Sequence, residues 1–172
     1  DGLFNLSMKE TWKLYEYWCF LKLNQILRKR YNLLESTLID IDYSGISVTL
    51  RKGRTAQVEY EHPQTEEKFT LTYNAKSGAS VTTGQKPDNI LSLSKEDSAV
   101  NYKFVFDAKY RLNPATVDSS YGRQYQSPGP EEDTINTMHR YRDAILTRES
   151  NEAKKTVVGA YVLFPYSNEQ EF

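Results

Sequence analysis

The sequence has almost no cysteine, no long hydrophobic run and almost no net charge. A single cysteine, Cys19, excludes an internal disulfide framework and favours a reducing compartment. It lies in an apolar helical pattern, where a cysteine is most often a buried small hydrophobe. The most apolar stretches, YWCFL and VVGAYVLF, are far shorter than the roughly 20 residues of a membrane-spanning helix, and no signal-peptide pattern begins the chain. We therefore expect a soluble, cytoplasmic protein that does not enter a membrane.

The charge balance excludes binding to nucleic acid through a global positive field. The chain has 22 basic and 23 acidic side chains and a net charge of -1, so any site for a polyanion must be local. A content of 38% hydrophobic residues, with 13 tyrosines and 7 phenylalanines, is typical of a folded protein. The length of 172 residues fits one domain. We expect residues 1–172 to be a single domain excised from a longer chain, since no methionine begins it.

The hydrophobic pattern predicts a helix, several strands, a second helix and a last strand. The first helix is predicted over residues 7–31, with Ser7 as its N-cap and an apolar stripe through Leu14, Trp18 and Leu21. Residues 113–131, with three prolines and two glycines, predict a long loop that is poorly ordered when nothing is bound. Strands are predicted at 45–53, 56–63, 67–74, 85–97, 101–112 and 155–166, and the second helix at 133–147. This order predicts an α/β fold with a mixed sheet flanked by helices.

The stretch FVFDAKYR, residues 104–111, places a charged pair directly after an apolar ridge. Because alternate residues of a strand share a face, Asp107 and Lys109 should point the same way. A carboxylate and an amine roughly 7 Å apart can divide the work of hydrolysis, the acid binding a divalent metal and the amine lying beside the polarised water or phosphate. The same spacing occurs in EEK (66–68) and EAK (152–154), and an exposed pair of this kind is often only a weak surface interaction.

Pro87 and Asp88 stand at the corner of the strand before this stretch. Adjacent strands can bring Asp88 and Asp107 to one end of a sheet, where their oxygens would hold Mg²⁺. Alone, Asp88 would be interpreted as a turn residue; its combination with Asp107 favours a metal site. Asp40 and Asp42 form another acidic pair, but no partner for them is evident, and we expect a loop or strand edge there.

Pro87-Asp88 followed by Asp107-Ala108-Lys109 resembles the motif of the PD-(D/E)XK nuclease superfamily, which includes restriction endonucleases and Holliday-junction resolvases. The predicted order of elements matches the α-βββ-α-β core of that restriction-endonuclease-like fold. The resemblance implies that Asp88, Asp107 and the carbonyl group of Ala108 hold the metal, and that Lys109 is the catalytic amine. It also implies a further carboxylate from the first helix, for which Glu16 is the candidate.

The stretches YEYWCFLKL, FDAKYR and DTINTMHRYRDAI are similar to sequences of the endonuclease-like domains of modification-dependent restriction systems, including McrC-type subunits. This similarity implies DNA as substrate, a role in defence against foreign DNA, a GTPase or AAA-type motor as partner, and a separate target-recognition domain. The second helix departs from the commonest pattern of exonuclease-like relatives, which have a glutamine and a tyrosine there. We take His139 and Arg142 of that helix as candidate substrate contacts, because arginine presents a planar fork to phosphate.

These observations lead to the hypothesis of a Mg²⁺-dependent DNA endonuclease domain, with Mn²⁺ as a substitute metal. Two alternatives remain open from the sequence. One is a catalytically degenerate nucleic-acid-binding or assembly module of the same fold, which the near-neutral charge also fits. The other is a phosphohydrolase that acts on nucleotides. The sequence leaves open the DNA sequence specificity, the cut pattern, the recognition of modified bases and the oligomeric state.

Overall fold

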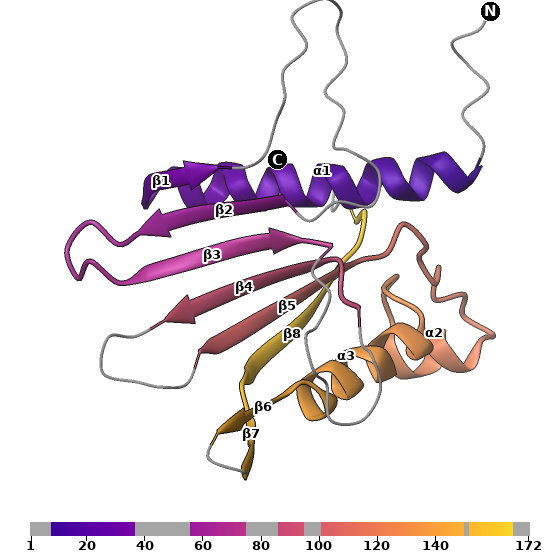
Figure 1. Cartoon of the computed structure of the whole chain (residues 1–172). Coiled ribbons are helices and arrows are strands. Elements are labelled where there is room, and N and C mark those ends of the chain that lie inside the picture. Colours follow the sequence, from indigo (N-terminus) through magenta and orange to yellow (C-terminus); the bar gives the residue numbers. More distant parts are fainter. Residues whose placement is uncertain (1–7, 37–55, 75–85, 95–100, 150–151, 167–172) are drawn as a thin grey trace, which may run out of the picture.

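The computed structural model describes residues 8–36, 56–74, 86–94, 101–149 and 152–166 (Figure 1). None of the helices in this part of the chain is both long enough and apolar enough to cross a membrane. In chain order the elements are α1 (Met8–Arg28), β1 (Asn32–Ser36), β2 (Ala56–Glu61), β3 (Lys68–Tyr73), β4 (Asn89–Ser94), β5 (Tyr102–Ala108), α2 (Ser120–Tyr125), α3 (Glu132–Ala144), β6 (Leu146–Glu149), β7 (Glu152–Lys155) and β8 (Val157–Leu163).

Six strands form one mixed sheet in the order β1-β2-β3-β4-β5-β8. Strands β1 to β5 are an antiparallel meander, and β8 lies parallel to β5. A parallel neighbour needs a crossover connection, and the chain between β5 and β8 supplies it through α2, α3 and the β6-β7 hairpin. In Figure 1, α1 runs along the β1 to β3 part of the sheet, and α2 and α3 lie on the β8 side. The predicted α/β fold with a mixed sheet flanked by helices is confirmed.

The two long helices cover opposite faces of this sheet. Phe104 of β5 pairs with Leu91 of β4, and Leu91 packs against the core that lies under α1. Val105, the next residue of β5, packs against α3. Successive residues of a strand point to opposite faces, so the cores under α1 and α3 lie on either side of the strands. The core under α1 is built from Phe20, Ala56, Val58, Tyr60, Phe69, Leu71 and Tyr73. The core under α3 is built from Val105, Met138, Tyr141, Ile145 and Val157.

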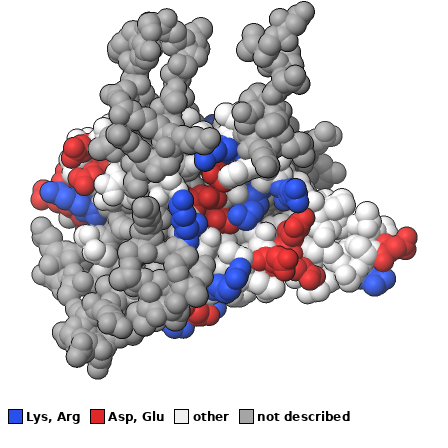
Figure 2. All heavy atoms as spheres, turned by 45° about the vertical axis from the view of Figure 1, so that its right-hand side comes forward, with Lys and Arg blue, Asp and Glu red and all other residues white. Residues whose placement is uncertain are grey.

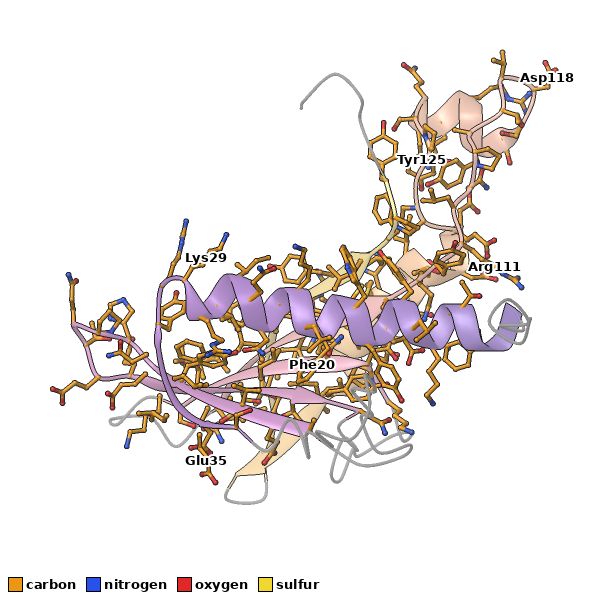
Figure 3. All side chains as sticks on the ribbon, turned by 90° about the horizontal axis from the view of Figure 1, so that it is seen from above. Phe20, Lys29, Glu35, Arg111, Asp118 and Tyr125 are labelled. Atoms are coloured by element: carbon orange, nitrogen blue, oxygen red, sulfur yellow. The ribbon has the colours of Figure 1, made fainter. Side chains whose placement is uncertain are left out.

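The inward face of α1 differs from the predicted one. The helix is present, but Leu14, Trp18 and Leu21 of the predicted apolar stripe are exposed, while Phe20 and Asn24 are buried. Figure 3 shows Phe20 between the helix and the strands. Apolar and aromatic residues surround most of this helix, so its periodicity does not specify which face turns inward. The inward polar residue is accounted for by a hydrogen bond that Tyr60 Oη donates to Asn24 Oδ1 at 2.5 Å.

Several smaller predictions are also corrected or left open. Strand β1 and the β6-β7 hairpin were not predicted, and the second helix ends at Ala144 rather than near residue 147. The predicted strand at 45–53, the cap at Ser7 and the acidic pair of Asp40 and Asp42 lie outside the described residues. Cys19 is a buried free thiol, as expected, and burial raises its pKa to about 11.

Residues 113–131 form a folded excursion rather than the poorly ordered loop that was predicted. Its centre is α2, where Gly122 N donates to the side chain of the N-cap Ser119 at 2.8 Å. A β-bridge between Asn113 and Gly129 closes its base, and Tyr121 Oη donates to the Pro130 carbonyl at 2.7 Å. These local hydrogen bonds hold the segment in a defined conformation without a bound ligand. Figure 3 shows the excursion, with Asp118 and Tyr125, standing away from α1 and the sheet.

Candidate active site

The charged pair of the FVFDAKYR stretch lies at the end of β5. Asp107 is 2% exposed, and its Oδ2 lies 2.5 Å from Lys109 Nζ. Tyr141 Oη of α3 donates to Asp107 Oδ1 at 3.4 Å. The Lys109 side chain is 41% exposed, so it connects the buried carboxylate with solvent. A buried carboxylate is costly unless it is paired, which explains why the lysine directly follows the strand.

Asp88 reaches the same place from the neighbouring strand. It directly precedes β4, and the start of that strand lies beside the end of β5 through the pairing of Asn89 with Phe106. Asp88 Oδ2 accepts a hydrogen bond from Ala108 N at 2.8 Å. This bond holds the Asp88 carboxylate at the residue that separates Asp107 from Lys109 in the chain. The structure therefore brings Asp88, Asp107 and Lys109 together, as the adjacent-strand argument predicted.

Burial and the neighbouring acids raise the pKa of Asp88. Burial raises its pKa from the ordinary value to about 7, and the charges of Asp107 and Glu16 add to the rise. The N–H group of Ala108 and the ammonium group of Lys109 act in the opposite direction but do not cancel it. The carboxyl groups thus share a site in which another positive charge would be stabilising.

Glu16 enters this site from α1. It lines one cavity together with Ala108 and Lys109, and its Oε2 accepts a hydrogen bond from Tyr73 Oη at 3.4 Å. Burial raises the pKa of Glu16, while the nearby charge of Lys13 lowers it without reversing the shift. The structure therefore places the predicted helix glutamate beside the strand acids, although α1 presents a different face from the predicted one.

Lys109 is held as an ammonium group in this arrangement. Partial burial alone would lower its pKa, but the hydrogen bond to Asp107 and the charges of Asp107, Asp88 and Glu16 outweigh burial and raise it. Its backbone is also fixed, since Lys109 N donates to the Leu163 carbonyl of β8 at 2.8 Å. A lysine with a raised pKa acts as a cation and a hydrogen-bond donor, and it is a poor acceptor of protons.

Helix α3 contributes Tyr141 to the site and places the predicted substrate contacts His139 and Arg142 elsewhere. His139 and Arg142 are exposed and line a separate hollow of about 470 Å³ between α3 and β8, which also includes Met138 and Tyr161. Tyr141 is buried, and burial followed by the charges of Asp107 and Asp88 raises its pKa, so it remains a donor. Its spacing from Met138 and Ile145 was the available signal, because these residues share the inward face of the helix.

Glu16, Ala108 and Lys109 line a cavity of about 430 Å³ between α1, the end of β5 and the start of α3. Figure 2 shows basic and acidic side chains next to one another in the middle of one face, without a broad area of either sign. This mixture agrees with the near-neutral net charge of the chain. The cavity is lined by Trp12, Glu16, Ala108, Lys109, Tyr110, Arg111, Glu131 and Thr134.

The donor set suits a hard divalent cation, although it is not assembled as a metal site. No three His, Cys, Asp or Glu side chains in the described ranges are grouped so as to hold a metal ion. However, Asp107 Oδ2 is buried with only the close contact to Lys109 and no hydrogen bond of regular geometry. Carboxylate oxygens are the ligands that Mg²⁺ prefers. The residues therefore fit such an ion once the Lys109 ammonium group moves away from Asp107.

Comparisons with known proteins agree with this geometry at the level of the family. No curated protein matches the chain, and no solved structure matches it. A family model described as the PD-(D/E)XK nuclease superfamily matches residues 13–169. This range includes Glu16, Asp88, Asp107 and Lys109, and the six-stranded mixed sheet with its flanking helices is the fold that the resemblance implied. The chain belongs to the PD-(D/E)XK nuclease superfamily.

Proposed function

We propose that this nuclease domain is a Mg²⁺-dependent DNA endonuclease, with Mn²⁺ as a substitute metal. The observation that carries the proposal is the convergence of three motif side chains at one end of the sheet. Asp88 Oδ2 accepts from Ala108 N at 2.8 Å, while Asp107 Oδ2 contacts Lys109 Nζ at 2.5 Å. Carboxylates on adjacent strands with an amine beside them are a suitable arrangement for hydrolysis of a phosphodiester.

The proposed metal ligands are the carboxylates of Asp88 and Asp107, the carbonyl group of Ala108 and the carboxylate of Glu16. The bound metal would supply charge stabilisation at the scissile phosphate and a water molecule of lowered pKa. Tyr141 holds Asp107 in place through its hydrogen bond to Oδ1, and Tyr73 does the same for Glu16. The carboxylates are thus oriented by donors that are themselves part of the sheet or of α3.

Lys109 acts in this proposal as a cation rather than as a base. Its pKa is raised by Asp107, Asp88 and Glu16 against the effect of burial. An ammonium group at the mouth of the site donates hydrogen bonds to a phosphate oxygen and neutralises charge that develops on the phosphate. Lys109 would therefore not take the proton of the attacking water, and a different acceptor would be needed.

The biological context of the proposal comes from the similarity to McrC-type domains. We propose a cytoplasmic role in restriction of foreign DNA, together with a GTPase or AAA-type motor subunit and a separate target-recognition domain. The near-neutral charge of the chain supports this division of work, because a domain with 22 basic and 23 acidic side chains has no strong field of its own for DNA. His139 and Arg142 remain candidate DNA contacts from the hollow beside β8.

Cleavage of plasmid and oligonucleotide DNA in Mg²⁺ or Mn²⁺ tests the proposal. The variants Asp107→Asn and Lys109→Met should cut at least about 100-fold more slowly than the parent, as expected when a group that stabilises the transition state is removed. The control is Lys155→Met, which removes the lysine of an exposed pair, Lys155 with Asp143 at 2.8 Å. This control should cut like the parent. Equal cleavage by all of these proteins would refute the catalytic assignment.

The degenerate nucleic-acid-binding or assembly module is kept as the second candidate for one reason. The acids of the described residues are not grouped to hold a metal, and the ammonium group of Lys109 already satisfies Asp107. Calorimetric titration with Mg²⁺ and Mn²⁺ separates the two functions. Binding that is lost in Asp107→Asn supports the nuclease, whereas no metal binding by the parent supports the module.

A further inference from the structure

The cavity that Glu16 and Lys109 line has an aromatic wall. Trp12 of α1 is 45% exposed and Tyr110, just after β5, is 48% exposed, and both line the cavity together with Glu16 and Lys109. Half-exposed tryptophan and tyrosine rings in a cleft leave apolar area in water that a flat partner could cover. The nuclease motif does not account for either ring.

One of these rings packs against a third ring, and the other has a cation beside it. Tyr110 packs against Tyr15 of α1 with ring centroids 5.6 Å apart and an interplanar angle of 60°. Lys13 Nζ lies 5.6 Å from the centroid of the Trp12 ring. A ring held by packing on a helix loses little freedom when a ligand stacks on it, which favours a role in binding.

The charges around the cavity place the phosphate and the base on different sides. Lys109 and Arg111 line it from the end of β5, and Figure 3 shows Arg111 beside the N-terminal half of α1. Glu131 lines it from the start of α3, and Glu132 and Asp133 follow in the first turn of that helix. A phosphodiester is therefore attracted to the β5 side and repelled from the α3 side, and Tyr110, between Lys109 and Arg111 in the chain, and Trp12 of α1 are the rings that line the same cavity for the base.

An intact duplex does not offer a base face to such a wall, because each base is covered by its neighbours. Stacking on a side chain beside the cleavage site requires a base that has left the stack or has no complementary strand. Aromatic rings combined with nearby cations are also the usual composition of surfaces that bind single strands.

We propose that Trp12 and Tyr110 stack on an unpaired nucleobase next to the scissile phosphate, so that the domain prefers single-stranded or locally unpaired DNA to intact duplex. This inference rests on the proposed nuclease function, since it assigns the substrate class of the same site. Stacking contributes whichever base is present, because every base has a π-face. The expected preference therefore concerns single-stranded against duplex DNA rather than the base sequence.

Binding of labelled single-stranded and duplex oligonucleotides tests the inference in the full chain that carries Lys109→Met, with Ca²⁺ present to prevent cleavage. Addition of Trp12→Ala should weaken binding to the single strand about tenfold and leave duplex binding within about twofold. The matched control is Trp18→Ala, because Trp18 is 54% exposed on the same helix but lines a different pocket. Trp12→Leu repeats the test with an apolar side chain in place.

Fluorescence supplies a second measurement that does not depend on stability. The chain has two tryptophans, so Trp18→Phe leaves Trp12 as the only reporter and Trp12→Phe leaves Trp18. A single-stranded oligonucleotide should quench the Trp12 reporter and leave the Trp18 reporter unchanged. An unquenched Trp12, equal losses for single strand and duplex, or equal effects of the changes at Trp12 and Trp18 would each overturn the inference. Failure of the nuclease function itself would appear separately, as absence of cleavage by the parent.

Discussion

The carboxyl group of Asp88 has a pKa well above its ordinary value. Burial and the charges of Asp107 and Glu16 raise its pKa to about 7. The folded state therefore holds the proton of Asp88 more tightly than the unfolded state, in which the pKa is about 4. The contribution of this group to stability is complete below pH 4 and is lost as the pH rises through 7.

We predict that Asp88→Asn stabilises the metal-free protein at pH 8 by roughly 1 to 3 kcal/mol, because it removes a buried charge beside two other acids. The amide oxygen can still accept from Ala108 N. Thermal unfolding in chelator at pH 8 should show a melting temperature several degrees above that of the parent, and the difference should shrink as the pH falls toward 4. The exposed Asp118, changed to Asn, serves as a control without effect. A lower melting temperature for Asp88→Asn at pH 8 would contradict this prediction.

At the residue scale, the sequence predicted the strand residues of the site better than the helix residues. Asp107 lies at the end of β5 with Lys109 directly after the strand, and Asp88 directly precedes the antiparallel neighbour β4, so the short range of strand pairing was enough to bring them together. Tyr141 was passed over in favour of His139 and Arg142, although only Tyr141 contacts Asp107. All three lie within one helical turn, and which of them faces the sheet depends on packing against β5 and β8.

At the scale of the element, α1 shows how an aromatic helix is oriented. Its outward face carries large apolar residues, and its inward face carries Phe20 at 0% exposure and a buried asparagine. The aromatic rings of the sheet select this face, since Phe20 and Tyr17 both pack against Tyr73 with centroids 5.4 and 5.3 Å away. The same orientation turns Glu16 toward the acids of β4 and β5.

Two adjacent residues of α1 test this orientation. Phe20→Ala should lower the free energy of unfolding by about 3 to 5 kcal/mol, because it removes a fully buried ring from the core under the helix. Leu21→Ala, which changes the next residue at 38% exposure, should cost less than about 1 kcal/mol. Urea denaturation followed by circular dichroism measures both. If the two variants lost equal stability, the described orientation of α1 would be wrong.

The crossover between β5 and β8 is the element that completes the site. It brings α3 onto the sheet face that contains Val105 and Asp107, and it places the Leu163 carbonyl group where it accepts from Lys109 N at 2.8 Å. The folded excursion at 113–131 is part of this crossover, and its part with Asp118 and Tyr125 stands away from α1 and the sheet in Figure 3. The backbone of Lys109 is therefore fixed by a strand that follows it by about fifty residues in the chain.

At the scale of the whole molecule, the net charge of -1 means that the domain has little general attraction for DNA. In the proposed reaction, the acids at the end of the sheet would also repel the DNA phosphate. Affinity for DNA should therefore depend on a divalent cation more than on the protein's own basic residues, since the cation would reverse the local sign of the site.

We predict that Ca²⁺ at constant ionic strength increases the affinity of the parent for DNA by at least about tenfold, or about 1.4 kcal/mol. Ca²⁺ is a hard cation that carboxylate oxygens bind, and its charge would offset that of Asp88, Asp107 and Glu16. Fluorescence anisotropy with a labelled oligonucleotide measures the change. The increase should be absent in Asp107→Asn. Equal affinity of the parent with Ca²⁺ and with chelator would speak against a metal site at these acids.

By itself, the sequence determined the class of the protein: the order of its main elements without β1, α2 and the β6-β7 hairpin, the mixed sheet and the meeting of Asp88, Asp107 and Lys109. These features depend on local periodicity and on pairing between strands that follow one another, which short-range patterns encode. Only the tertiary structure decided which faces of α1 and α3 turn inward, that Tyr141 contacts Asp107 and that Trp12 and Tyr110 line the cavity. Those choices depend on how side chains from distant segments fill one core, and helical periodicity does not resolve them when apolar residues surround the helix.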